Sequence, residues 1–183
     1  MSSEKKTTPP GSGSGALPAI APTTTCGSGA CALIVEGNAA EQKKLKELVE
    51  KIRNSGPKGK AFIEGLEKGP KKTRLFIGKS ATDKDGTVVQ LSTLGGGVTT
   101  RPTKSQSGDN EVHIDPTNLI NYTADDGSTV KETEEGLLLH EMGHAQRLNE
   151  GDPAQTSGGP AAESNVRTTT NPIRTELGMR PEK

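Results

Sequence analysis

His140, Glu141 and His144 form an H-E-x-x-H pattern, which is the arrangement in this chain that most clearly supports chemistry. A helix turns once in about 3.6 residues, so histidines four positions apart lie on one helix face and can bind one metal ion. Glu141 lies next to the first histidine, where its carboxylate can activate a water molecule. The chain contains 3 histidines and two of them fall in this pattern. The pattern therefore indicates a zinc-binding helix with hydrolytic chemistry.

The flanking sequence predicts the helix that this pattern needs. Thr129 and Glu132 have the spacing of a capping box, which marks a helix start. Leu137 and Leu148 share one stripe with the two histidines. Residues 149–153 read Asn-Glu-Gly-Asp-Pro and predict a stop, so we expect a capped helix of about 20 residues. The alternative is a surface helix that carries two histidines by chance.

A third metal ligand is required, because catalytic zinc usually has three protein ligands and one water. No histidine occurs between Gln146 and Pro153, so we expect a downstream carboxylate. Glu163 is the preferred candidate, since it follows His144 by 19 residues and a Gly-rich loop between them allows the chain to reverse. Glu176 is the second candidate.

The remaining sequence predicts the elements that position these residues. Apolar residues at i, i+3, i+4 and i+7 spacing predict helices, and short β-branched or alternating runs predict strands. The predicted elements are helices over residues 41–54 and 58–67, strands over 73–79, 87–91 and 111–115, a loop over 95–110, a turn-rich segment over 118–127, a loop over 151–160 and a short helix from 160 to about 168.

This order of elements predicts an α+β fold of the minimal zincin type. We expect a small antiparallel sheet packed on the H-E-x-x-H helix, followed by a short downstream helix. The edge strand of such a sheet can hold an extended peptide through backbone hydrogen bonds. The strand around His113 is the expected edge.

Two segments of different composition divide the 183 residues. Residues 1–38 are rich in Ser, Thr, Pro and Gly, and we predict that they are disordered. Residues 39–183 are the predicted metallopeptidase domain. Its core should be lean, because 28% of the chain is hydrophobic and 2% aromatic. Cys26 and Cys31 in the first segment are compatible with either a local disulfide or two reduced thiols.

Charge and hydropathy restrict the partners. The formal net charge is 0, so no nucleic-acid partner is expected. Residues 43–79 hold twelve Lys or Arg and four Glu, which we interpret as solvated faces. Residues 109–152 hold eleven Asp or Glu and two basic residues, which predicts a preference for cationic ligands.

No apolar run approaches the roughly 18 residues of a membrane span, and residues 16–22 are too short and proline-rich for a signal peptide.

Three segments resemble the bacterial effector metallopeptidases, whose best-known member is an enterobacterial type III effector that cleaves host mitogen-activated kinases. They are His140–Ala145, Glu163–Arg167 and Asn171–Gly178, and the resemblance covers about residues 111–181. It implies a zinc-dependent endopeptidase with His140 and His144 as ligands and Glu141 as the base. It also favours Glu163 over Glu176 as the third ligand.

The resemblance further implies a donor that stabilises the transition state. Tyr122 is the only tyrosine of the chain, so a tyrosine donor is Tyr122 or absent. His113, Arg167 and Arg174 are the other candidates. Alternatively, Arg174 pairs with Glu176 or another nearby carboxylate and is structural.

We therefore expect a secreted bacterial effector or toxin that hydrolyses a protein of the target cell. It would leave the bacterium without a cleavable signal peptide, by a type III or type VI-like route. It would be a monomer, with an immunity protein or a secretion-system carrier as a further partner. Two alternatives are a zinc amide hydrolase acting on cell-wall peptide and a metal-stabilised interaction module without catalysis. Glu141 argues against the module, because it binds no metal and would have no purpose there.

Overall fold

A computed structural model describes residues 23–24, 32–83, 85–100 and 108–183 of the chain. Cys26 and Cys31 lie outside the described residues, as does most of the segment that is predicted to be disordered. The predicted domain boundary at residue 39 is too late, because Leu33–Val35 form strand β2. All three residues of β2 are buried, as expected for a short apolar run inside a sheet.

The main sheet has five strands in the order β1-β2-β3-β7-β6. Strand β2 pairs in parallel with β3, and β3 pairs in parallel with β7, whereas β1 and β6 pair antiparallel at the two ends. The other strands of this sheet are β1 (Thr23–Thr24), β3 (Thr73–Ile77), β6 (Gly97–Thr100) and β7 (Asn110–Ile114).

The structure is thus α+β as predicted, but the prediction of an antiparallel sheet is wrong. Helices α1 (Ala39–Arg53) and α2 (Pro57–Glu67) lie between β2 and β3 in the chain. A helical crossover of this kind returns the chain to the starting end of the sheet, so the two strands run in parallel. The two helices themselves agree with the predicted ranges to within two residues.

Two small hairpins lie outside the main sheet. Strands β4 (Ser80–Thr82) and β5 (Val88–Gln90) form one, so the strand predicted over 87–91 is confirmed but does not join the main sheet. A short 3-10 helix, Leu91–Thr93, follows β5. Strands β8 (Asn121–Thr123) and β9 (Thr129–Lys131) form the other hairpin. Strand β8 lies in the segment predicted to be turn-rich, whereas β9 occupies residues predicted to begin the helix.

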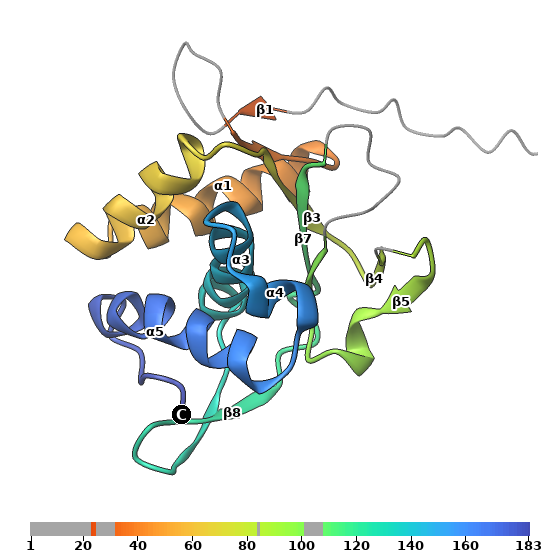
Figure 1. Ribbon diagram of the computed structural model, residues 1–183. Helices are drawn as coiled ribbons and strands as arrows, with labels where there is room; N and C mark the ends of the chain where they lie inside the picture. Colours follow the sequence, from red (N-terminus) through yellow and green to blue (C-terminus); the bar gives the residue numbers. More distant parts are fainter. Residues whose placement is uncertain (1–22, 25–31, 84, 101–107) are drawn as a thin grey trace, which may run out of the picture.

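Helix α3 (Glu134–Asn149) carries the H-E-x-x-H pattern through the middle of the molecule (Figure 1). It begins later than the predicted capping box, since Thr129 belongs to β9 and Thr133 is the N-cap. The Thr133 hydroxyl accepts a hydrogen bond from the Gly136 backbone N–H at 3.1 Å. Leu137, Leu138 and Leu139 are all buried, because the sheet and α1 pack on one side of α3 and α5 on another.

Helices α4 (Pro153–Ser157) and α5 (Pro160–Glu176) follow α3. The predicted loop over 151–160 therefore contains a short helix, and the predicted short helix is twice as long as expected. Pro172 lies inside α5 without ending it. Contacts on both sides of Pro172 stabilise this turn: Asn171 binds the Glu182 backbone, and Ile173 is buried in the core.

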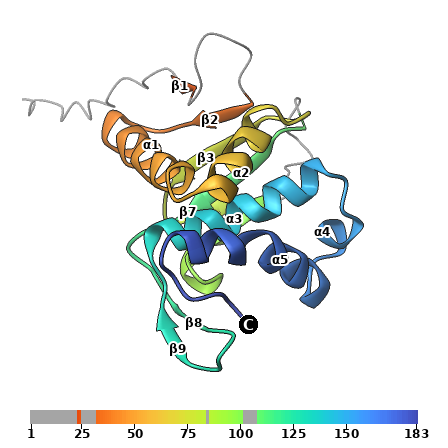
Figure 2. The same ribbon diagram turned by 90° about the vertical axis from the view of Figure 1, so that its left-hand side faces the viewer.

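One hydrophobic core joins the elements. It lies between one face of the sheet and helices α1, α2 and α3, as the two ribbon views show (Figures 1 and 2). Its members include Leu33, Val35, Leu45, Ile52, Ile63, Leu75, Val112, Ile114, Leu138 and Met142. No helix in the described parts of the chain is long and apolar enough to cross a membrane.

Ion pairs connect the basic and acidic parts of the sequence. Lys44 on α1 binds Glu134 at 2.6 Å, and Lys51 pairs with Glu135 at the start of α3. Both lysine side chains also remain exposed to solvent, in agreement with the interpretation of this region as solvated faces. The two pairs neutralise Glu134 and Glu135, and the preference for cationic ligands stays a prediction.

Two glycine substitutions test the packing of α3. An alanine Cβ at Gly143 would lie 2.8 Å from Thr170 Cγ2 and 2.9 Å from Val166 Cγ1 on α5. We expect Gly143→Ala to lower the free energy of unfolding by about 1–3 kcal/mol, as overpacking does. Chemical denaturation measures this change.

Gly65→Ala in α2 is the matched control. Nothing lies within 4 Å of a Cβ at Gly65, which is exposed inside a helix. Alanine there should raise the free energy of unfolding by about 0.5–1 kcal/mol, because it lowers the entropy of the unfolded chain. If Gly143→Ala proved as stable as Gly65→Ala, α5 would not pack on α3 as described.

Candidate metal centre

His140, His144 and Glu163 come together between α3 and α5. The two histidines lie one turn apart on α3, and Glu163 faces them from the first turn of α5. Nε2 of His140 is 3.2 Å from Oε2 of Glu163, and Nε2 of His144 is 3.4 Å from Oε1. Ligand atoms of all three residues lie within 4.8 Å of one another, so they could hold one metal ion. Glu163 thus lies where the third ligand was predicted.

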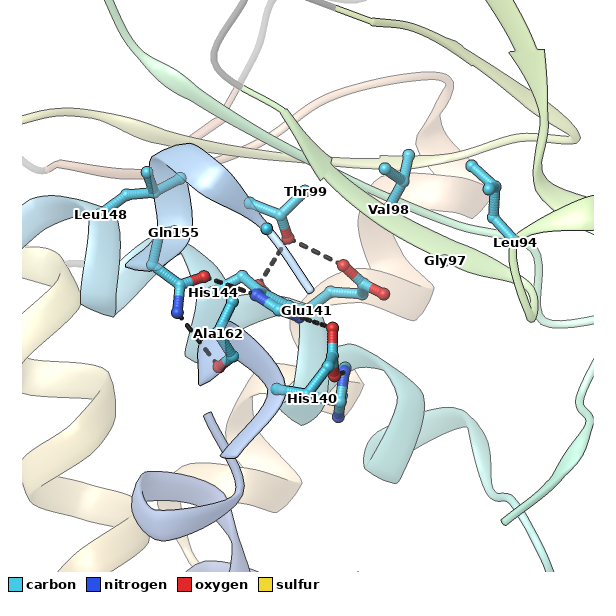
Figure 3. Close-up of a pocket in the computed structure, with 12 residues that line it drawn as sticks. Leu94, Gly97, Val98, Thr99, His140, Glu141, His144, Leu148, Gln155 and Ala162 are labelled. Carbon is cyan, nitrogen blue, oxygen red and sulfur yellow. Dashed lines mark hydrogen bonds and ion pairs between the residues drawn. The ribbon is translucent and has the colours of Figure 1, made fainter. Parts of the chain in front are cut away.

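The other ring nitrogens of the two histidines have hydrogen-bond acceptors. Nδ1 of His140 is 3.1 Å from a carboxylate oxygen of Glu182, and Nδ1 of His144 is 2.7 Å from the amide oxygen of Gln155. The Gln155 amide is oriented by its own Nε2, which donates to the Ala162 carbonyl at 3.2 Å (Figure 3). Acceptors at both Nδ1 atoms favour a proton there, so Nε2 is the nitrogen that each ring can offer to a metal ion. This is the tautomer that metal binding requires.

The charges of the three groups are coupled. Burial disfavours the protonated form of His140, but hydrogen bonds to Glu163 and Glu182 outweigh burial and raise its pKa to about 10. The pKa of His144 is raised in the same way, mainly by its hydrogen bond to Glu163. Hydrogen bonds from both histidines lower the pKa of Glu163. The carboxylates around the two rings therefore stabilise positive charge at this position, which protons on Nε2 supply when no metal ion is bound.

Glu141 lies beside this cluster without joining it. Its carboxylate is buried, and the Thr99 hydroxyl of β6 lies 2.9 Å from Oε2 (Figure 3). Burial raises the pKa of Glu141, which moves the carboxyl toward the range of a general base. A Cβ at Gly97 would lie 2.7 Å from the Glu141 side chain, so glycine is what allows β6 to approach α3 so closely.

A cleft of about 400 Å³ opens over these residues. Its walls come from β6, from α3, from α4 and from the first turn of α5 (Figure 3). A smaller hollow of about 150 Å³ adjoins it and shares Leu94, His140 and Glu141 as lining residues. Strand β6 ends the sheet on the cleft side, since it pairs only with β7 among the described strands.

The structure corrects the prediction for His113. Strand β6 covers β7, so β7 is an inner strand and β6 is the edge beside the cleft. His113 alternates with Val112 and Ile114, which face α3, so its side chain lies on the opposite face of the sheet. There it stacks on Phe76 with ring centroids 4.6 Å apart. His113 is therefore not a donor to the site.

Arg174 and Tyr122 are engaged elsewhere. Arg174 is fully buried and pairs with Glu132 at 2.6 Å and with Glu182, so it is structural and binds carboxylates other than Glu176. Tyr122 stacks under the Arg174 guanidinium, and its hydroxyl donates to the Arg180 carbonyl at 2.8 Å. Neither group is free to act as a transition-state donor in this conformation.

Arg167 remains a candidate donor. It lies one turn after Glu163 on α5 and is half-buried. Within the described residues its guanidinium has no hydrogen bond.

Glu176, the second candidate for the third ligand, is placed far from the histidines. Its carboxylate accepts hydrogen bonds from the backbone N–H groups of Lys58 and Gly59 at 3.0 and 2.9 Å. It therefore caps the N-terminus of α2, where a negative charge also interacts favourably with the helix dipole.

Three residues that contact the site were not predicted: Thr99, Gln155 and Glu182. Two of them had a signal in the sequence. For Thr99 the signal is the preceding run Gly95-Gly96-Gly97, which is compatible with a close approach of the backbone as well as with a loop. For Gln155 the signal is Asp152-Pro153, a pair that typically starts a helix. No local pattern indicates Glu182.

Comparison with known protein families, with curated proteins and with solved structures gives no match to this chain. Its function therefore has to follow from the geometry of its site.

Two alanine substitutions distinguish the candidate ligands. Loss of a residue that hydrogen-bonds to a metal ligand typically weakens metal binding by about 10–100-fold. Glu163→Ala removes a ligand itself, so it should weaken zinc binding by more than this. Glu176→Ala should keep zinc affinity and lower the free energy of unfolding by about 0.5–2 kcal/mol, as loss of a helix cap does. Chelator competition measures the first effect and chemical denaturation the second. The reverse pattern would contradict the assignment of Glu163.

Proposed function

We propose that this protein is a zinc-dependent endopeptidase. The observation that carries the proposal is the position of Glu141: a buried carboxylate that binds none of the candidate metal ligands directs its oxygens into the same cleft. A site that only stabilised the fold would not need this group, and structural zinc sites are usually closed by four protein ligands. Three candidate ligands next to an open cleft fit a catalytic site better.

The chain's residues divide the work of hydrolysis. A bound zinc ion would be held by His140, His144 and Glu163, and it would supply Lewis-acid polarisation and lower the pKa of a water molecule. Glu141 accepts the proton of the attacking water and passes it to the leaving amine. The Thr99 hydroxyl lies within hydrogen-bonding distance of both the Glu141 backbone carbonyl (2.6 Å) and its carboxylate (2.9 Å), and burial raises the carboxyl pKa to suit this exchange.

Strand β6 supports a peptide as the substrate. Its outer edge lies along the cleft, so its backbone groups can pair with an extended chain. Such pairing would lay a scissile bond across the space between Glu141 and Glu163. Arg167 is the remaining side-chain candidate for stabilising the oxyanion, because it lies one turn from Glu163.

We further propose that the peptidase is a secreted bacterial effector or toxin acting on a target-cell protein. The support is the resemblance of residues 140–145, 163–167 and 171–178 to that group. The roles assigned to His140, His144, Glu141 and Glu163 are compatible with the positions these residues have in the site. A cell-wall peptide amide would use the same chemistry, and substrate assays separate the two.

Glu141→Gln tests the proposed base. This variant should keep the fold and stoichiometric zinc, because Glu141 is not a ligand, and should lose at least about 10²–10⁴-fold in turnover. Casein, and then a proteome-derived peptide library, serve as substrates, and elemental analysis reports the zinc content.

Glu150→Gln, an exposed change at the end of the same helix, is the matched control and should keep near-full activity. Full activity of Glu141→Gln would exclude the metallopeptidase mechanism. Cleavage of cell-wall peptides but of no protein would favour the amide-hydrolase alternative.

A further inference from the structure

The segment after α5 returns to the metal centre. The Asp125 backbone N–H donates to the Pro181 carbonyl at 3.1 Å, and the Lys183 N–H donates to the Thr123 carbonyl at 2.9 Å, both on the β8–β9 hairpin. From the other side, the Asn171 side chain holds the Glu182 backbone, with its amide donating to the carbonyl at 2.8 Å and its oxygen accepting from the N–H at 2.9 Å. The backbone of Glu182 is thus fixed between the hairpin and α5.

The side chain of Glu182 is fixed as well. It is 9% exposed, and one carboxylate oxygen lies 3.1 Å from Nδ1 of His140. The other oxygen pairs with Arg174, which is fully buried and also binds Glu132 just before α3. A chain of contacts therefore runs from Glu132 through Arg174 and Glu182 to His140.

This chain of contacts carries an excess of negative charge. Two buried carboxylates, Glu132 and Glu182, share the single guanidinium of Arg174. A buried charge without a partner is costly, so the excess needs a cation nearby. The Glu182 carboxylate is the one that contacts His140, so positive charge on the His140 ring, from a proton or from a metal ion at Nε2, balances it.

The second histidine has a different partner. His144 meets the neutral amide of Gln155, whereas His140 meets a carboxylate. A carboxylate at Nδ1 fixes the ring and raises the basicity of the ligand nitrogen more than a neutral acceptor does. Of the two histidines, His140 is therefore the one whose ligand strength depends on a partner from a distant segment.

We propose that Glu182 is a positioning residue for the metal centre, and that docking of residues 180–183 and metal binding stabilise each other. This inference rests on the proposed zinc site but assigns a residue and a segment that the H-E-x-x-H pattern does not contain. Coupling between two binding events is reciprocal, so a docked segment raises zinc affinity and zinc holds the segment in place.

Two glutamine substitutions in the full chain test the inference. Glu182→Gln and Glu132→Gln each remove one carboxylate from the same buried guanidinium, but only Glu182 contacts His140. We expect Glu182→Gln to weaken zinc binding by about 10–100-fold in chelator competition. Glu132→Gln should lower stability while changing zinc affinity much less. Equal losses of affinity, or no loss for Glu182→Gln, would overturn the inference.

Hydrogen exchange in the wild-type protein gives a second readout, which does not depend on a variant that folds. The backbone N–H of Glu182 should exchange more slowly in the zinc-loaded protein, by a larger factor than the N–H of Gly78, which bonds to Ile114 within the sheet. Equal factors would contradict the coupling. If the wild-type protein binds no zinc, the proposed function itself is wrong. Failure of the coupling and failure of the proposed function are therefore distinguishable.

Discussion

The packing of α5 against α3 is the contact on which the candidate metal centre depends. The two histidines come from α3 alone, but Glu163 reaches them only because α5 crosses α3 closely. Gly143 provides the space for this approach, since a Cβ there would meet Val166 and Thr170 at less than 3 Å. The glycine inside the H-E-x-x-H pattern therefore serves helix packing, while its neighbours serve chemistry.

The local part of the site could be predicted from the sequence. The positions of His140, Glu141 and His144 relative to one another follow from helix periodicity, which is a property of a few consecutive residues. Glu163 followed from the chemical need for a third ligand. Glu182 could not be predicted, because it contacts His140 across 42 residues of chain and no local pattern encodes such a contact. Thr99 contacts Glu141 over the same separation, and the glycine run before it indicates a close backbone approach but not the partner.

The fold shows the same division between local and long-range information. The ranges of α1, α2, β3 and β7 follow from apolar spacing, and they agree with the prediction to within two residues at most ends. Strand direction does not follow from a strand's own residues. It depends on the crossover that joins two strands, so the parallel pairing of β2 with β3 and of β3 with β7 was missed. Strand β6 was missed because its glycines also suit a loop.

X-ray absorption spectroscopy of the zinc-loaded protein tests the central claim most directly, since it reports the atoms that surround the ion. Two imidazoles with a carboxylate and a water predict a first shell of nitrogen and oxygen at about 2.0–2.2 Å, with outer-shell scattering from two histidine rings. In each of the variants His140→Ala and His144→Ala, the spectrum should lose the outer-shell scattering of one histidine ring. A first shell with sulfur, or a wild-type spectrum without histidine scattering, would contradict the site described for this protein.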